Sequence, residues 1–236
     1  MRVAIVMISY KRKNGLSKQH LERSLLSIKN QTNQNFKLFL VGDKYEDEEE
    51  FYSFKNYLPE DQFTVINLEE AYERSRWSGY EMWCTAPVKA TNYGIELALK
   101  EGFDYVCHID DDDYYLPNHI EIIHQAIKDT GNNFIHTTCH IIRGDTEFDF
   151  PTLTENLYEE VNPIGGSLAK CSVCINYRNF SLRPRNVFEE TGTHLVYDCD
   201  LFNRTHDLFN ETGECAIKVN KVTVVNDDEK NIIRTE

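Results

Sequence analysis

The segment His108-Ile109-Asp110-Asp111-Asp112-Asp113-Tyr114-Tyr115-Leu116-Pro117 places four consecutive aspartates directly after an apolar run. The run at residues 105–109 is typical of a buried strand, and residues 118–128 have the pattern of a helix. Neighbouring carboxylates repel one another and raise each other's pKa unless a cation neutralises them. A divalent metal held by oxygen ligands is the simplest reason for such a cluster at a strand end.

Strand and helix patterns alternate on both sides of this segment. Residues 2–9 form a continuous β-branched run, residues 16–30 carry apolar side chains on one helical face, and residues 36–41 form a second apolar run. This order is a βαβ unit, whose crossover is right-handed. Further strands are predicted at 63–68, 103–109, 134–143, 168–177 and 216–225, and further helices at 51–58, 87–100 and 198–208. In residues 69–84 and 146–160 the apolar side chains follow no clear helical or strand periodicity, so these segments are not assigned.

The chain is therefore predicted to be α/β, with a mostly parallel central sheet flanked by helices. No internal repeat or low-complexity linker divides residues 1–236, which indicates a single domain. Ligands of such sheets bind beyond the carboxyl ends of the strands. Three groups follow strand ends here, and we expect them to meet at one edge: Ser9-Tyr10, Asp43 and Asp110 to Asp113.

Composition narrows the possible partners. A net charge of −14 argues against nucleic acid or an anionic membrane surface as the main ligand. No segment has the length of a transmembrane helix, and residues 3–8 are too short for a signal peptide. Seven scattered cysteines do not suggest a disulfide framework. We expect a cytoplasmic location, with peripheral membrane association left open, and the oligomeric state is not predicted.

Six motifs in order resemble those of the family 2 glycosyltransferases, which have the Rossmann-like GT-A fold. They are Ile8-Ser9-Tyr10, Ser27-Ile28-Lys29-Asn30-Gln31-Thr32, Val41-Gly42-Asp43, Asn92-Tyr93-Gly94-Ile95, the segment from Asp110 to Pro117, and Tyr197-Asp198-Cys199-Asp200-Leu201-Phe202-Asn203-Arg204. An Asp-x-Asp pattern alone is common by chance. The ordered set, at the expected strand ends, is specific and covers nearly the whole chain.

The resemblance implies a role for each matching position. Asp43 would bind the nucleotide base with Tyr10 packed nearby, Asp112 would bind the metal, and Asp198 would be the catalytic base. The remaining predicted nucleotide-binding residues are Ser9, Asn92, Asp110 and Asp111, with Asp110 also a possible metal ligand. Simpler roles stay open for five of these residues. They are a strand-end turn at Ser9-Tyr10, a helix or turn cap at Asp43, a helix cap at Asp113 and a pair with Arg204 for Asp200.

The implied reaction is transfer of one sugar from a nucleoside-diphosphate sugar, UDP-linked by the resemblance, to a hydroxyl of a saccharide or other acceptor. Mn²⁺ or Mg²⁺ would neutralise the leaving diphosphate. A separate carboxylate would take the proton of the acceptor hydroxyl, and such a single displacement inverts the anomeric carbon. Residues 1–117 would form the nucleotide-sugar half and residues 118–236 the acceptor half.

The chain also departs from the family pattern. Tyr197 stands where the family has a glutamate, and Asp227 or Asp228 stands near the place of a metal-binding histidine. Cations for the diphosphate are not fixed by a motif, and the candidates are Lys89, Arg178, Arg183 and Arg185. Two other functions remain open: a GT-A-like nucleotidyltransferase, which would release pyrophosphate, and a non-catalytic module that binds a nucleotide or metal.

Overall fold

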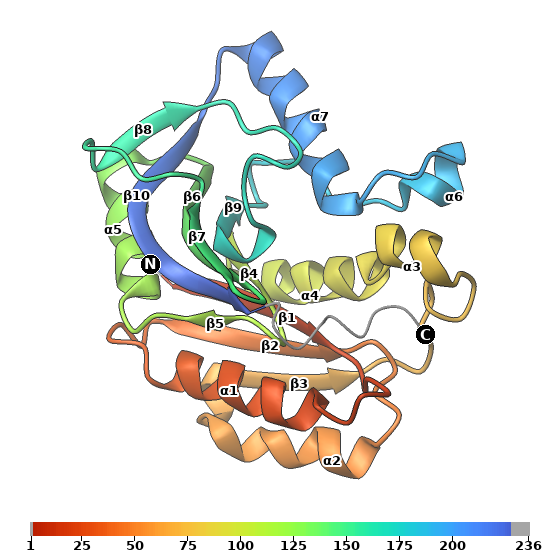
Figure 1. Ribbon diagram of the computed structural model, residues 1–236. Helices are drawn as coiled ribbons and strands as arrows, with labels where there is room; N and C mark the ends of the chain where they lie inside the picture. The colour runs from red at the N-terminus through yellow and green to blue at the C-terminus, as the bar shows by residue number, and fades with distance from the viewer. Residues whose placement is uncertain (1, 228–236) are drawn as a thin grey trace.

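A computed structural model describes residues 2–227 of the chain (Figure 1). The strands are β1 (Val3–Ser9), β2 (Phe36–Gly42), β3 (Phe63–Asn67), β4 (Tyr105–Asp110), β5 (Tyr114–Tyr115), β6 (Phe134–Arg143), β7 (Thr146–Phe150), β8 (Tyr158–Val161), β9 (Val173–Asn176) and β10 (Ala216–Asp227). The helices are α1 (Ser17–Lys29), α2 (Glu48–Ser53), α3 (Gly79–Thr85), α4 (Val88–Lys100), α5 (His119–Thr130), α6 (Val187–Thr191) and α7 (Tyr197–Thr212). Short 3₁₀ turns lie at Phe54–Tyr57, Glu60–Gln62 and Lys170–Ser172.

All strands belong to one sheet, in the order β3-β2-β1-β4-β9-β6-β10-β5, with β7 paired to β6 and β8 to β10. The first half, from β3 to β4, is parallel as predicted. In its register Ser9 lies opposite Gly42, and Ile8 lies opposite Asp110. The carboxyl ends of β1, β2 and β4 therefore meet at one edge of the sheet.

The second half of the sheet is mixed, so the predicted parallel arrangement describes the first half better than the whole. Strand β9 runs antiparallel to both β4 and β6, while β10 is parallel to β6 and antiparallel to β5 and β8. The strand predicted at 168–177 is shorter, because residues 170–172 form a 3₁₀ turn before β9 begins. That turn brings Lys170 to the end of β4.

Two apolar layers cover the sheet, and the alternation of side chains along β1 separates them. Val3, Ile5 and Met7 pack in the layer of α1 and α5, whereas Ala4, Val6 and Ile8 pack in the layer of α4 and α7. Figure 1 shows the first strands between α1 and α4. The predicted helical faces are confirmed, because Leu21, Leu25 and Ile28 of α1 are buried, as are Ala90, Ile95 and Ala98 of α4.

Gly94 explains how closely α4 approaches the sheet. A Cβ atom at this position would lie 2.6 Å from Cγ1 of Val6, a distance that no real contact reaches. The glycine of the Asn-Tyr-Gly-Ile motif therefore serves helix-to-sheet packing.

The two segments without a sequence-based assignment contain α3, β7 and β8. Residues 51–58, predicted as one helix, are divided between the end of α2 and a 3₁₀ turn. Within residues 2–227, no helix combines the length and the apolar character that a bilayer span requires.

Candidate active site

The ends of β1 and β4 bring Ser9 and the aspartate cluster together. The Ser9 hydroxyl donates a 2.6 Å hydrogen bond to Asp111. Arg12, in the turn after β1, binds both carboxylate oxygens of Asp111 at 3.0 and 2.5 Å and lies 3.2 Å from Asp112. Asp111 is only 2% exposed, and a buried carboxylate needs such a partner. Arg12 therefore neutralises the centre of the cluster.

Lys170 connects the first aspartate of the cluster with α7. Its ammonium is ion-paired with Asp110 and donates a 2.7 Å hydrogen bond to the hydroxyl of Tyr197. Burial opposes the charge of Lys170, but Asp110 and Tyr197 outweigh this effect and raise the pKa of the ammonium. The lysine therefore remains protonated between β4 and the first turn of α7.

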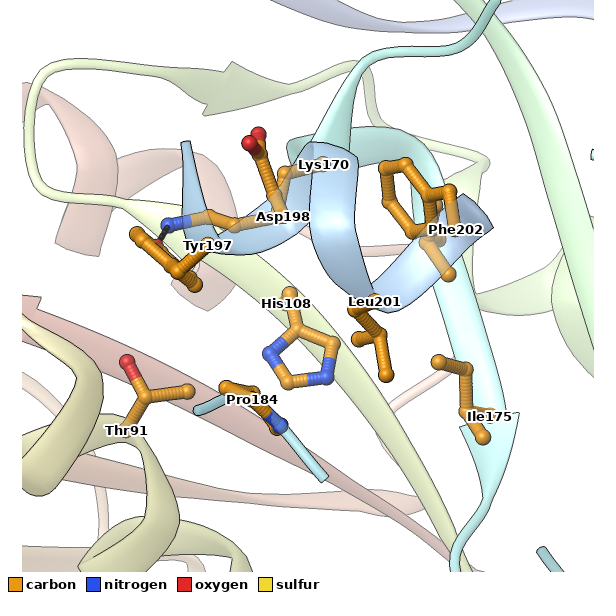
Figure 2. Close-up of a pocket in the computed structure, with 10 residues that line it drawn as sticks. Thr91, His108, Lys170, Ile175, Pro184, Tyr197, Asp198, Leu201 and Phe202 are labelled. Atoms are coloured by element: carbon orange, nitrogen blue, oxygen red, sulfur yellow. Dashed lines mark hydrogen bonds between the residues drawn. The ribbon is translucent and has the colours of Figure 1, made fainter. Parts of the chain in front are cut away.

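Asp198 follows Tyr197 in that first turn. One of its oxygens accepts a 2.7 Å hydrogen bond from the backbone N–H of Cys199. Burial raises the pKa of the Asp198 carboxyl, and the nearby Lys170 partly offsets the rise. In Figure 2 the carboxylate points away from His108 and Leu201, which lie in a narrow pocket beneath the helix. A carboxylate with a raised pKa is a better proton acceptor at neutral pH.

Asp113 is not a helix cap, which corrects that alternative. Helix α5 begins six residues later at His119, after Asn118. Asp113 is instead 1% exposed and accepts a 2.7 Å hydrogen bond from the side-chain amide of Asn226. Burial, and then the neighbouring Cys171 thiol, raise the pKa of this carboxyl. Asp113 is therefore part of the core between β4 and β10.

Asp227, one of the two candidates for a further metal ligand, lies at the end of β10. It is ion-paired with Arg23, whose guanidinium also donates to the backbone carbonyl of Asp112. Asp227 is thus connected to the aspartate cluster through Arg23. Asp228 lies outside the described residues.

The carboxylate oxygens of the aspartate cluster are compatible with a divalent metal ion whose other ligands come mainly from the substrate. In residues 2–227, no group of three histidine, cysteine or acidic side chains is arranged to hold a metal alone. Mg²⁺ in nucleotide sites commonly takes one or two carboxylates and completes its coordination with phosphate oxygens and water. Asp112, with hard oxygens and a side chain 10% exposed at the strand end, fits that pattern.

Asp43 lies at the end of β2 in a second buried ion pair. Arg74 donates a 2.8 Å hydrogen bond to one carboxylate oxygen and also binds the Asp43 backbone carbonyl. The other oxygen, Oδ1, is buried without a hydrogen-bond partner among the described residues. Burial raises the pKa of this carboxyl, against the effect of Arg74. Asp43 is not a cap, since Asp47 caps α2.

Tyr10 lies between this ion pair and the aspartate cluster. The guanidinium carbons of Arg12 and Arg74 lie 4.9 and 4.6 Å from the centre of its ring. The ring therefore contacts both of the arginines that neutralise Asp111 and Asp43.

Glu73 is a further buried carboxylate in this region. It accepts a 3.0 Å hydrogen bond from the backbone N–H of Lys89 in the first turn of α4. Burial raises the pKa of the Glu73 carboxyl to about 7.

The structure does not bring Asn92 together with the other predicted site residues. Its side-chain amide donates a 2.8 Å hydrogen bond to the carbonyl of Pro184. Asn92 lines a separate surface pocket with residues such as Lys89 and Glu189. Its observed contact therefore holds the segment before α6 against α4.

The four candidate cations have other contacts. The Lys89 ammonium lies 4.1 Å from the ring centre of Tyr72, and Arg178 pairs with Asp104. Arg183 binds backbone carbonyls, and Arg185 pairs with Asp200. Asp200 also pairs with Arg204, which is the simpler role that the sequence left open for it.

Four other cations contact the site, and the sequence did not predict them: Arg12, Arg23, Arg74 and Lys170. Of these, Arg12 had a usable signal, because it lies three residues after the end of the first strand.

Comparisons with known proteins agree with this geometry. The model of the family described as glycosyl transferase family 2 matches residues 85–205, half of the chain. An uncharacterized glycosyltransferase, R139 of Acanthamoeba polyphaga mimivirus, is 33% identical over 132 residues, which are 56% of this chain and 53% of that protein. The chain thus spans about half the length of this curated relative.

Solved structures show the same fold. Residues 1–349 of S. aureus TarS in complex with UDP superpose with a TM-score of 0.63 at 13% identity, covering 96% of this chain and 60% of that one. The complex of the same protein with UDP-GlcNAc gives 0.63 at 14% identity, covering 98% and 59%. The architecture is thus the α/β fold of GT-A glycosyltransferases. The chain belongs to glycosyl transferase family 2.

Proposed function

We propose that this protein is a metal-dependent, inverting glycosyltransferase that moves one sugar from a UDP-linked donor to an acceptor hydroxyl. The observation that carries the proposal is the Lys170 bridge between Asp110 and Tyr197. This bridge holds two carboxylate groups in one site, although they lie about ninety residues apart in sequence. The aspartate cluster at the end of β4 would bind the nucleoside diphosphate with its metal ion. The other carboxylate, Asp198, would face the acceptor.

The donor would lie along the ends of β2, β1 and β4. The buried Oδ1 atom of Asp43 lacks a partner among the described residues, as expected for an acceptor that receives an N–H from a base. Asp110 and Asp111 would receive the ribose hydroxyls, with Ser9 orienting Asp111. The TarS structures with UDP and UDP-GlcNAc support a UDP-linked donor.

Asp112 would hold Mn²⁺ or Mg²⁺ together with the diphosphate. Such an ion neutralises the charge that develops on the leaving oxygen. Arg12, which already lies beside Asp111 and Asp112, adds a fixed positive charge at the same end of β4. Residues 1–117 would thus supply most donor contacts, and residues 118–236 would carry the base and the acceptor side.

Asp198 would accept the proton of the attacking hydroxyl. Its raised pKa favours proton uptake, and its position on a helix rather than in the aspartate cluster allows attack from the face opposite the leaving group. With no second carboxylate at the position of Tyr197, Asp198 is the base that this geometry provides.

The test is the substitution Asp198→Asn, with Asp207→Asn on the exposed face of the same helix as the matched control. We expect Asp198→Asn to abolish sugar transfer while calorimetry shows nearly unchanged UDP binding, and Asp207→Asn to behave as the wild type. Normal turnover by Asp198→Asn would contradict the assignment. Release of pyrophosphate instead of UDP would identify a nucleotidyltransferase, and NMR of the product anomeric proton would report inversion.

A further inference from the structure

Helix α3 exposes two aromatic side chains that stack on each other. Tyr80 and Trp83, one helical turn apart, have ring centres separated by 5.5 Å and ring planes inclined by 26°. They are 56% and 45% exposed, so each residue presents a large surface to solvent. Exposed stacked aromatics on a short helix do not contribute to the core, and large exposed apolar surfaces commonly mark binding sites.

Further rings extend this surface from α3 to α6. The ring of His194 lies 5.7 Å from Tyr80, and Phe188 lies 4.8 Å from His194. Trp77, on the segment before α3, lies 6.4 Å from Phe188. We call Tyr80, Trp83 and His194 the aromatic platform. Phe188 contacts the platform through His194, and Trp77 in turn contacts Phe188.

The platform lies beside the start of α7. Helix α3 contacts α6, and the short segment that follows α6 leads directly into the first turn of α7. Figure 1 shows α3 next to α6 and the beginning of α7. The platform is therefore continuous with the acceptor side of the proposed site.

We propose that the aromatic platform binds the acceptor, and that the acceptor is a saccharide whose pyranose ring stacks on Tyr80 and Trp83. This inference rests on the proposed transferase function and adds the chemical class of the acceptor. The face of a pyranose presents C–H groups with partial positive charge, which complement the negative face of an aromatic ring. The sugar hydroxyls remain at the rim, where one of them reaches Asp198.

The composition of the platform favours a saccharide over a lipid or a peptide segment. Tyr80, Trp83 and His194 are rings with polar edges, and the polar residues Ser78 and Glu81 flank Tyr80 in the sequence. Flat rings with polar edges suit a ring that is apolar on its faces and polar around its rim. The net charge of −14 also disfavours an anionic lipid surface.

The kinetic test compares Trp83→Ala and Tyr80→Ala with the control Tyr93→Ala, which removes an exposed aromatic side chain from α4. The acceptors are methyl hexopyranosides, cellobiose and chitobiose, with UDP-sugar and Mn²⁺ at saturation. For the best acceptor we expect KM to rise about tenfold in the two platform variants and to remain unchanged in the control. Trp83→Phe should restore most of the affinity. Donor hydrolysis without acceptor should be the same in all variants.

A binding measurement completes the test without relying on turnover. In a Trp77→Phe background, Trp83 is the remaining tryptophan of the two, and its fluorescence should shift when a saccharide is added to the UDP-loaded protein. If the protein hydrolyses the donor but no saccharide changes this fluorescence, or if Trp83→Ala keeps the wild-type KM, the platform inference is overturned. A protein that binds no UDP and hydrolyses no donor would overturn the proposed function instead.

Discussion

The ammonium of Lys170 lies 2.7 Å from the hydroxyl of Tyr197, the residue that directly precedes Asp198. The same ammonium is paired with Asp110 at the end of β4. One buried cation therefore links the aspartate cluster at the end of β4 to the helix that carries Asp198. Tyr197, at the position where the family pattern has a glutamate, supplies the hydroxyl that accepts this hydrogen bond from Lys170.

Replacing Lys170 by methionine should lower both the stability of the protein and its rate of sugar transfer. The side chain has similar length, but Asp110 and Tyr197 lose their charged partner, which should lower the free energy of unfolding by about 2 kcal/mol. We also expect kcat to fall more than the KM for the donor changes, since Asp198 loses its support. Urea unfolding and steady-state kinetics measure both effects.

The control for this change is Arg178→Met. Arg178 and its partner Asp104 are each more than half exposed, so their pair should contribute less than about 1 kcal/mol. Equal stability losses in the two variants would contradict a special role for Lys170.

Asp43→Asn should weaken UDP binding. The substitution keeps the shape of the side chain but removes the charge that strengthens its hydrogen bonds, so we expect the Kd for UDP to rise about tenfold. Calorimetry can compare it with Asp47→Asn, which lies four residues later and retains an oxygen to cap α2. Unchanged affinity in Asp43→Asn would show that the base binds elsewhere.

Asp112→Asn should remove the contribution of Mn²⁺ to UDP binding. In the wild type we expect Mn²⁺ to tighten UDP about tenfold, because the ion contacts both the diphosphate and a carboxylate. In the variant, the thermal shift with UDP should be the same with and without Mn²⁺. The control Asp104→Asn, at an exposed position, should keep the metal effect. A metal effect that survives in Asp112→Asn would argue for another ligand.

Glu73 should make stability depend on pH. Its pKa is about 7 in the folded protein and near 4.5 without burial, so the folded state holds a proton that the unfolded state releases between these values. The free energy of unfolding should therefore fall as pH rises from 4.5 to 7, by at most about 3 kcal/mol. Glu73→Gln should flatten this part of the curve, which urea unfolding at a series of pH values would show. If the free energy of unfolding of Glu73→Gln still fell with pH as in the wild type, other titrating groups would be the cause.

Much of the fold could be predicted because hydrophobic periodicity is a local signal. Strands β1, β2 and β4 are apolar runs that are buried on both faces, and α1 and α4 are amphipathic. Strand β7 is mostly exposed and pairs with β6 alone, so its residues lack a clear apolar pattern. The direction of β9 depends on its neighbours in the sheet, which no local pattern reveals.

The residues of the candidate site likewise fall into those that a local pattern reveals and those that it does not. Aspartates at strand ends are visible in the sequence, whereas the partners of Asp110 and Asp43 are Lys170 and Arg74, which are distant in the chain and belong to no motif. Asn92 matches a motif, and its side-chain amide donates a hydrogen bond to the carbonyl of Pro184, so its nucleotide contact stays a prediction. The glycine of the same motif serves the packing of α4 on the sheet.

Strand β10 determines when the fold can be completed during synthesis. It is the partner of β6, β5 and β8, yet its residues, 216–227, are made long after those of β6. Until they leave the ribosome, one side of β6 has unpaired backbone groups, and an open strand edge can pair with other chains. The nascent protein therefore passes through a stage with an exposed edge, and a chain released before residue 216 would keep that edge permanently.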